Sequence, residues 1–151
     1  MKIIKGDLIA LAKSGQFNVI VHGCNCFCTM GAGIAKQIRD QFPEAYQADL
    51  KTNRGDKEKL GSYSLATVQQ NNHAVTIVNA YTQFDFSGPG ILANYTAIKR
   101  IFNRIKIQFT GQRIGYPKIG AGLAKGDWRV IAHIIDKALK GEKHTLVEYQ
   151  P

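Results

Sequence analysis

The sequence predicts an α/β domain with a mixed, largely parallel central sheet that helices cover on both faces. Short β-branched or alternating segments recur along the chain, and segments with the apolar spacing of amphipathic helices separate most of them. Strands that alternate with helices form parallel sheets, which need cover on both faces. Because 151 residues is the size of one domain, we expect a single three-layer α/β/α unit over residues 1–151.

The strands are predicted from β-branched runs and from alternating apolar residues. The run 17–21, Phe-Asn-Val-Ile-Val, is typical of a buried strand. Asn71 and Asn72 are the expected turn between two neighbouring strands. The six predicted strands cover residues 2–5, 17–21, 62–69, 74–81, 113–116 and 144–150.

The helices are predicted from apolar residues three or four positions apart. Such spacing indicates a helix over 31–42, and Pro43 opens a further helix because proline is tolerated in a first turn. A short helix is expected over 7–13, and Asp127 is the expected N-cap of the last helix. Two longer apolar stripes predict helices in the second half of the chain, through Ile91, Tyr95, Ile98, Phe102 and Ile105 and through Ile131, Ile134, Ile135 and Leu139.

The formal net charge of +9 indicates a surface that attracts anions such as nucleotides or nucleic acid. The lysines and arginines are scattered and aromatic residues do not interleave with them, so we expect only weak or non-specific nucleic-acid binding. No apolar run approaches the ~18 residues of a membrane span. The first seven residues lack a signal-peptide layout. We therefore expect a cytoplasmic monomer that does not engage a membrane.

Three cysteines, Cys24, Cys26 and Cys28, follow His22 at alternating positions. In an extended segment all four side chains would share one face, which raises the alternative of a zinc site. However, strand residues two apart lie about 6.6 Å apart with parallel side chains, which does not close a tetrahedron. We expect no metal ligands and small, partly buried, reduced thiols.

Two glycine-rich loops are the candidate ligand-binding segments. Residues 28–34 and 119–126 each join a predicted strand to a predicted helix. Ligands of α/β sheets lie at such junctions, where glycines let backbone approach a phosphate and the helix start offers free N–H groups. Neither loop fits the Walker pattern or a full dinucleotide fingerprint, and each alone could be a plain tight turn. Together they suggest a diphosphate held from both sides.

These loops resemble those of the macrodomain family. Residues 22–26, His-Gly-Cys-Asn-Cys, and 30–35, Met-Gly-Ala-Gly-Ile-Ala, are similar to the first ligand loop of macrodomains. Residues 120–123, Gly-Ala-Gly-Leu, are similar to their second, diphosphate-binding loop. The early Gly-Asp-Leu at 6–8 and the closing Val-Glu-Tyr at 147–149 match further macrodomain motifs, so the resemblance covers most of the chain.

The resemblance implies a domain that binds ADP-ribose or ADP-ribose 1″-phosphate, free or on a macromolecule, without a cofactor. Asp7 would hold the adenine amino group, although it is equally suited to cap a helix. The Asn25 amide suits a ribose diol, with an Asx turn as the alternative. Tyr149 would stack on adenine or pack in the core. The implied ligand-binding residues are Asp7, Leu8, Asn25, Gly31, Ala32, Gly33, Ile34, Gly120, Ala121, Gly122, Leu123 and Tyr149.

The resemblance is greatest to the branch that contains ADP-ribose-1″-phosphate phosphatases and terminal ADP-ribose glycohydrolases. The His-Gly-Cys-Asn start and the later Asn-Tyr-Thr at 94–96 carry it. Those glycohydrolases use a lysine in the loop after the central strand and an aspartate just after the second glycine loop. This chain has Gln83 or its neighbours and Ala124 there, which favours a phosphatase acting on ADP-ribose 1″-phosphate.

His22 and Asp127 are the expected catalytic residues. His22 ends a buried strand just before the first loop, so we expect its side chain to reach the cleft and to move a proton for an attacking water. A structural role is the alternative for His22, as helix capping is for Asp127. Loop amides and the positive field would stabilise charge at phosphorus. Two other functions stay open: a non-catalytic ADP-ribose reader, and removal of ADP-ribose from protein or nucleic acid.

Overall fold

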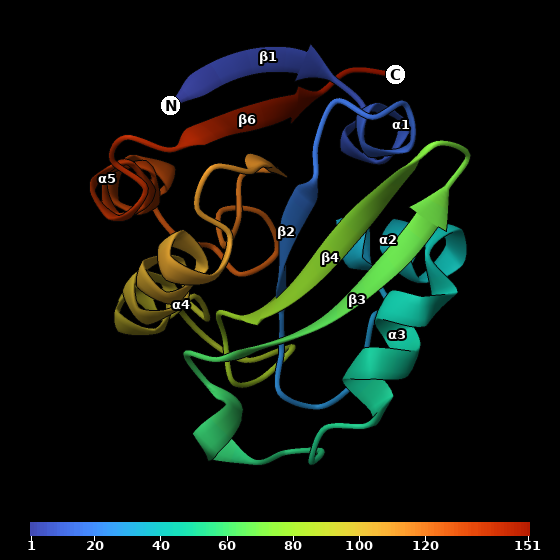
Figure 1. Ribbon diagram of the computed structural model, residues 1–151. Coiled ribbons are helices and arrows are strands. Elements are labelled where there is room, and N and C mark those ends of the chain that lie inside the picture. Colours follow the sequence, from blue (N-terminus) through green and yellow to red (C-terminus); the bar gives the residue numbers. More distant parts are fainter.

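The computed structural model describes residues 1–151 as one six-stranded sheet between two layers of helices (Figure 1). None of its helices is long and apolar enough to cross a bilayer. The strands are β1 (Lys2–Gly6), β2 (Val19–Cys24), β3 (Tyr63–Gln70), β4 (His73–Tyr81), β5 (Arg113–Tyr116) and β6 (Lys143–Tyr149). The helices are α1 (Leu8–Lys13), α2 (Gly33–Gln41), α3 (Pro43–Leu50), α4 (Tyr95–Gln108), α5 (Trp128–Ala138) and the 3-10 turn η1 (Lys57–Lys59).

The sheet is mixed and largely parallel, as the sequence predicts. Its strand order is β1-β6-β5-β2-β4-β3, and every neighbouring pair is parallel except β3 with β4. The antiparallel pair is joined by the expected turn at Asn71 and Asn72. Parallel pairing brings the carboxyl ends of β1, β6, β5 and β2 to one edge of the sheet, together with the loops that follow them.

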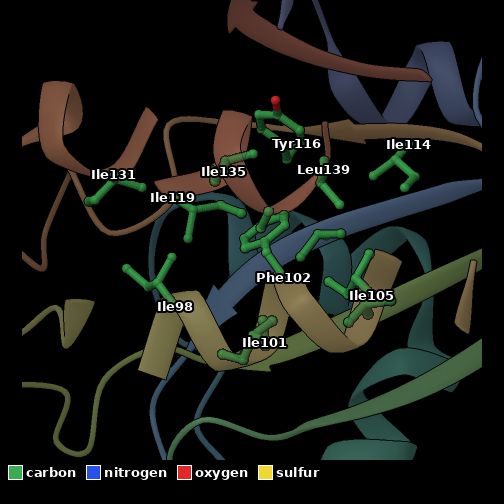
Figure 2. Close-up of a cluster of buried hydrophobic side chains, with 14 of the residues drawn as sticks. Ile98, Ile101, Phe102, Ile105, Ile114, Tyr116, Ile119, Ile131, Ile135 and Leu139 are labelled. Carbon is green, nitrogen blue, oxygen red and sulfur yellow. The ribbon is translucent and has the colours of Figure 1, made fainter. Parts of the chain in front are cut away.

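Helices cover both faces, which confirms the three-layer arrangement (Figure 1). On one face α4 and α5 enclose a core of 19 buried residues, and Figure 2 shows Ile98 and Phe102 of α4 in the same cluster as Ile131 and Ile135 of α5. On the other face α1, α2 and α3 enclose a core of 12 buried residues. Successive residues of β2 feed the two cores in turn, with Val19 and Val21 in the first and Ile20 in the second.

Several predicted boundaries differ from the structure by two residues or more. Ile91 lies outside α4 and is 57% exposed, because Asn94 caps the helix by accepting a 2.9 Å hydrogen bond from the Ala97 amide. α2 begins at Gly33 rather than at residue 31. β2 extends to Cys24, because its last residues continue the parallel ladder with β4.

Two aspartates cap helices. The Asp7 carboxylate accepts a 3.0 Å hydrogen bond from the Ala10 amide at the start of α1. The Asp127 carboxylate accepts a 2.9 Å hydrogen bond from the Arg129 amide at the start of α5, as expected. Each satisfies a helix amide that would otherwise lack an acceptor.

A buried polar network links β2, β4, β3 and α3. His22 is fully buried, and its Nε2 lies 2.7 Å from Asn79 Oδ1, so a neutral imidazole donates to the amide oxygen. Asn79 Nδ2 in turn donates to the carbonyl of Ala45 at 2.9 Å and to the Ser64 hydroxyl at 3.1 Å. Every side chain of this chain of bonds thereby has a partner, which buried polar groups need.

This network predicts that acid destabilises the fold through His22. Burial lowers the pKa of His22 from 6.5 to about 4, and the bond to Asn79 offsets only part of this. In the unfolded chain the His22 imidazole binds a proton below pH 6.5, whereas in the native protein it stays neutral until about pH 4. The free energy of unfolding therefore decreases as the pH falls from 6.5 toward 4. From pH 7 to pH 5 this term amounts to about 2 kcal/mol. Between pH 7 and pH 5, the free energy of unfolding measured in urea should fall by that much more for wild type than for His22→Gln. This variant keeps a hydrogen-bond donor for Asn79. Equal losses would contradict the assignment.

Candidate functional site

Two adjoining cavities form a cleft at the carboxyl edge of the parallel strands. The large cavity, of about 500 Å³, lies between the loop after β2 and the loop after β5. The second cavity, of about 460 Å³, lies at the ends of β1 and β6. Gly33, Ile34, Pro117 and Lys118 line both, so the two cavities lie side by side. This is the edge at which α/β sheets hold ligands.

Most of the ligand-binding residues predicted from the sequence line this cleft. In the large cavity they are Asn25, Gly31, Ala32, Gly33, Ile34, Gly120, Gly122 and Leu123. In the second cavity they are Leu8, Gly33, Ile34 and Tyr149. Ala121 lines neither, and Asp7 lines a separate hollow of about 340 Å³ beside α1 and α2. The two glycine-rich loops therefore face one another across the cleft, as their spacing in the sequence suggested.

Two of the loop glycines have no role within the fold. Gly31 and Gly122 both have φ values that any residue adopts, and a Cβ on either would meet nothing within 4 Å. Gly120 differs, because the fold itself requires glycine there. Its φ of +73° favours glycine, and a Cβ on Gly120 would lie only 3.2 Å from the Ala93 Cβ. Gly33 has a φ of +59°, which again favours glycine. Only Gly31 and Gly122 are thus left to be explained by something that enters the cavity.

Backbone N–H groups with no acceptor line both sides of the cleft. In the second loop, the amides of Gly122, Leu123 and Ala124 donate no hydrogen bond within the protein. In the first loop, α2 begins at Gly33 without any side-chain cap, so the first amides of this helix are free as well. Free amides and a helix N-terminus favour a negatively charged ligand. The geometry is that of an anion site approached from two sides.

Asn25 has the geometry of its alternative, an Asx turn. Its Oδ1 accepts a 2.8 Å hydrogen bond from the Phe27 amide, and its Nδ2 donates to the Thr29 hydroxyl at 2.7 Å. The side chain still lines the large cavity, and a carbonyl oxygen can accept a second hydrogen bond. Asn25 thus shapes the first loop and presents its amide to the cleft at the same time.

Neither predicted catalytic residue lines the cleft. His22 is on the same face of β2 as Ile20, and its buried ring is bonded to Asn79 beneath α3. Asp127 caps α5 and lies 3.5 Å from the Arg129 guanidinium. Hydrogen bonds from Arg129 lower the pKa of Asp127, so this carboxylate is ionised at neutral pH. The expectation that the His22 side chain reaches the cleft is wrong, because β2 continues to Cys24. His22 therefore lies two residues inside the strand, where its ring is buried and bonded to Asn79.

Several further cleft residues were not among the predicted ligand-binding residues. Thr29, Gln83, Phe86 and Lys118 line the large cavity. Lys118 could have been found from the sequence, because it lies two residues after β5 and just before the second glycine-rich loop. Its ammonium lies 3.7 Å from the Glu148 carboxylate at the border of the two cavities. It therefore places a cation beside the free loop amides.

The large cavity contains few titratable groups. Of its 18 lining residues, none is an aspartate, a glutamate or a histidine, and only Cys24 and Lys118 titrate. Burial raises the pKa of the Cys24 thiol well above its ordinary range, so it stays protonated at neutral pH. Gln83 and Ala124, where the resemblance implies lysine and aspartate in glycohydrolases, both line the cavity. The cavity is thus rich in hydrogen-bond donors and poor in acids and bases.

The three cysteines do not converge on one point. Cys24 Sγ lies 3.6 Å from His22 Nε2, Cys26 Sγ lies 3.5 Å from a backbone oxygen of Gln83, and Cys28 Sγ lies 3.2 Å from the Asp49 carbonyl. No group of three or more potential metal ligands is assembled in the structure. The sulfurs instead act as small buried groups with separate partners.

Comparison with known proteins relates the chain to enzymes of ADP-ribose chemistry. An uncharacterised 17.5 kDa protein of Enterobacteria phage T4 is 38% identical, over 100% of this chain and 97% of the relative. An ADP-ribose 1″-phosphate phosphatase of Debaryomyces hansenii is 30% identical, over 91% of this chain and 93% of the relative. A DNA ADP-ribosyl glycohydrolase of Mycobacterium bovis is 25% identical, over 82% of this chain and 34% of the relative.

The fold and the family agree with these similarities. The structure of Thermosipho africanus DarTG in complex with ADP-ribose matches with a TM-score of 0.77 at 18% identity, over 98% of this chain and 41% of that chain. The family model of the Macro domain matches residues 21–135, which include both glycine-rich loops. The chain therefore belongs to the macrodomain family, as a relative of ADP-ribose 1″-phosphate phosphatases and of ADP-ribosyl glycohydrolases.

Proposed function

We propose that the cleft binds ADP-ribose, with the diphosphate between the two glycine loops. The observation that carries this assignment is the pair Gly31 and Gly122, which line one cavity and are not required by the fold. A diphosphate is the kind of ligand that needs backbone at close approach and several N–H donors. Lys118 adds a positive charge on the same wall.

The two cavities suit the two ends of this ligand. The second cavity offers Leu8, Val147 and the 68%-exposed ring of Tyr149, which is an apolar setting for adenine. The large cavity offers the polar side chains of Asn25, Thr29 and Gln83, which can hydrogen-bond the hydroxyls of a distal ribose. The similarity to a structure that holds ADP-ribose supports the same assignment.

The variant Gly122→Val should abolish much of this binding without unfolding the domain. A β-branched side chain would fill the space above the loop and hold the diphosphate away from the free amides. Loss of one or two charge-assisted hydrogen bonds corresponds to a roughly 10- to 100-fold weaker ADP-ribose affinity. Calorimetry measures the affinity, and circular dichroism verifies the fold.

The matched control is Ala121→Val, a similar increase in size at a neighbouring position of the loop that does not line the cleft. Its ADP-ribose affinity should stay within a few-fold of wild type. If both variants fold and bind as wild type does, the second loop is an ordinary turn and the proposed diphosphate position is wrong.

ADP-ribose should bind roughly 10- to 100-fold more tightly than AMP, since AMP lacks the second phosphate and the distal ribose that the large cavity would contact. Titration calorimetry of wild type with both ligands under the same salt conditions measures this ratio. Equal affinities would show that the large cavity adds nothing to ADP-ribose binding. The cleft would then be a site for the adenine nucleotide part of the ligand only.

We further propose that the protein hydrolyses ADP-ribose 1″-phosphate to ADP-ribose and inorganic phosphate. The support is the 30% identity to a phosphatase of that name over 91% of the chain. Water would attack phosphorus, and the bond from phosphorus to the 1″ oxygen would break. Loop amides and Lys118 would stabilise the charge on the phosphoryl oxygens. Because no carboxylate or imidazole lines the large cavity, a phosphate oxygen of the substrate would accept one proton of the attacking water, and this proton would pass to the departing 1″ oxygen.

The same scarcity of acids and bases favours a second candidate function, ADP-ribose binding without turnover. A third, removal of ADP-ribose from a macromolecule, has the support of the glycohydrolase relative. Gln83 and Ala124 weigh against it, since neither side chain supplies a charge at the two positions concerned. These three functions differ in their products, so one set of assays separates them.

Phosphate release from ADP-ribose 1″-phosphate should be detectable with wild type and should stay within a few-fold in His22→Gln, because this ring does not line the cleft. The comparison requires parallel incubations with ADP-ribosylated protein and ADP-ribosylated DNA. Loss of turnover in His22→Gln with unchanged ADP-ribose affinity would restore His22 as a catalytic group. Binding without any product would assign the second candidate, and free ADP-ribose from a macromolecule the third.

A further inference from the structure

The positive charge of the chain is concentrated in one layer of the fold. Residues 91–151 contain eleven lysines and arginines against four acids, a net charge of +7, whereas residues 1–90 contain nine against seven, a net charge of +2. The first of these segments forms α4, β5, α5 and β6, and its two helices cover the same face of the sheet (Figure 1). The excess charge therefore belongs mainly to the layer of α4 and α5.

Within this layer, α4 has the simplest charge pattern. Its 14 residues include Lys99, Arg100, Arg104 and Lys106 and no acid. Lys99, Arg100 and Arg104 are exposed, and none of them takes part in any of the four ion pairs of the structure. These three charges are thus available to a partner.

Packing does not account for these cations. The buried side of α4 is formed by other residues, among them Ile98, Phe102 and Ile105 (Figure 2). Arg100 and Arg104 are four positions apart, a spacing at which like charges repel and slightly weaken a helix. Since the core does not need these charges and no acid pairs with them, an anion outside the protein would explain them.

Both arginines lie beside residues at or just before the start of β3. The Arg104 guanidinium lies 5.1 Å from the centroid of the Tyr63 ring on β3. An Nη atom of Arg100 lies 3.4 Å from where a Cβ on Gly61 would stand, just before the same strand. Both side chains therefore extend from α4 toward the start of β3, with their Cα atoms about 6 Å apart along the helix axis. Guanidinium groups held in this way are suited to bidentate phosphate contacts.

We propose that the outer surface of α4, centred on Arg100 and Arg104, binds the phosphate backbone of a nucleic acid. A row of anions matches a row of unpaired cations, and sequence-independent binding needs nothing more. Binding in a membrane interface would also require a broad apolar face. The exposed side of α4 offers one large apolar residue, the 81%-exposed Ile107, among polar ones such as Asn103 and Gln108.

The test measures the affinity of labelled 20-nucleotide DNA and RNA single strands by fluorescence anisotropy, from 50 to 200 mM salt. Wild type should bind with a steep salt dependence. Arg100→Gln/Arg104→Gln should make the fall of log affinity with log salt shallower by about 1.4. It should weaken the affinity at 50 mM salt by roughly ten- to sixty-fold. Lys99 is exposed and forms no ion pair, so the single variant Lys99→Gln should make this fall shallower by about 0.7.

The matched control is Lys36→Gln/Arg39→Gln on α2, which removes the same charge from the opposite layer. Arg39 lies 4.5 Å from the centroid of the Tyr46 ring and so reproduces the setting of Arg104. This control should change nucleic-acid affinity less than threefold. No α4 residue lines the cleft, so ADP-ribose affinity should be unchanged in the α4 variants and weakened in Gly122→Val, which should still bind nucleic acid.

Three results would overturn the proposal. Wild type could fail to bind either strand at 50 mM salt. The α4 and α2 double variants could lose nucleic-acid affinity equally, which would show that binding depends on the net charge of the protein and not on the surface of α4. Vesicles with 30% phosphatidylserine could bind in an α4-dependent way while nucleic acid does not, which would identify a membrane as the partner.

Discussion

The parallel pairing of β2 with β5 is the constraint on which the rest of the cleft depends. The ladder sets Val19 opposite Ile114 and Ile20 opposite Gly115, so the loops that follow the two strands emerge side by side. Gly115 is required here, because a Cβ at this position would come within 2.8 Å of the Phe17 ring. With a side chain at 115, either Phe17 would leave the second core or the strands would shift. A glycine in β5 thus helps to set the spacing of the two loops that form the cleft.

The sequence predicts much of the fold because the determining interactions are local or periodic. The β-branched run before Cys24 and the stripes of α4 and α5 carry their own periodicity, and Asn71 and Asn72 favour a turn whatever surrounds them. The errors occur where tertiary contacts decide. Ile91 matches the stripe of α4, yet Asn94 starts that helix later. The end of β2 depends on its partner β4, about which the periodicity of β2 says nothing.

The site divides in a similar way. Glycine loops at strand ends could be recognised from the sequence, because the residue type itself reflects the need for open backbone. The burial of His22 could not, because it depends on how far β2 continues beside β4 and on Asn79, which belongs to another strand. Lys118 and Gln83 come from separate segments and meet only in the folded chain. The buried hydrogen bond from His22 to Asn79 shows that a histidine suited to proton transfer can instead have a structural role.

The glycines then separate the demands of the fold from those of the ligand. Gly120 and Gly126 are explained inside the protein, because a Cβ on Gly126 would stand 2.5 Å from the Gly120 carbonyl oxygen. Gly31 and Gly122 are not, since each has an ordinary φ and open space above it. The same reasoning applies to Lys99, Arg100 and Arg104 of α4, which the core does not need and which form no ion pair. In both places the residues that the fold leaves unexplained face outward, and they indicate anions: a diphosphate in the cleft and a row of phosphates along the helix.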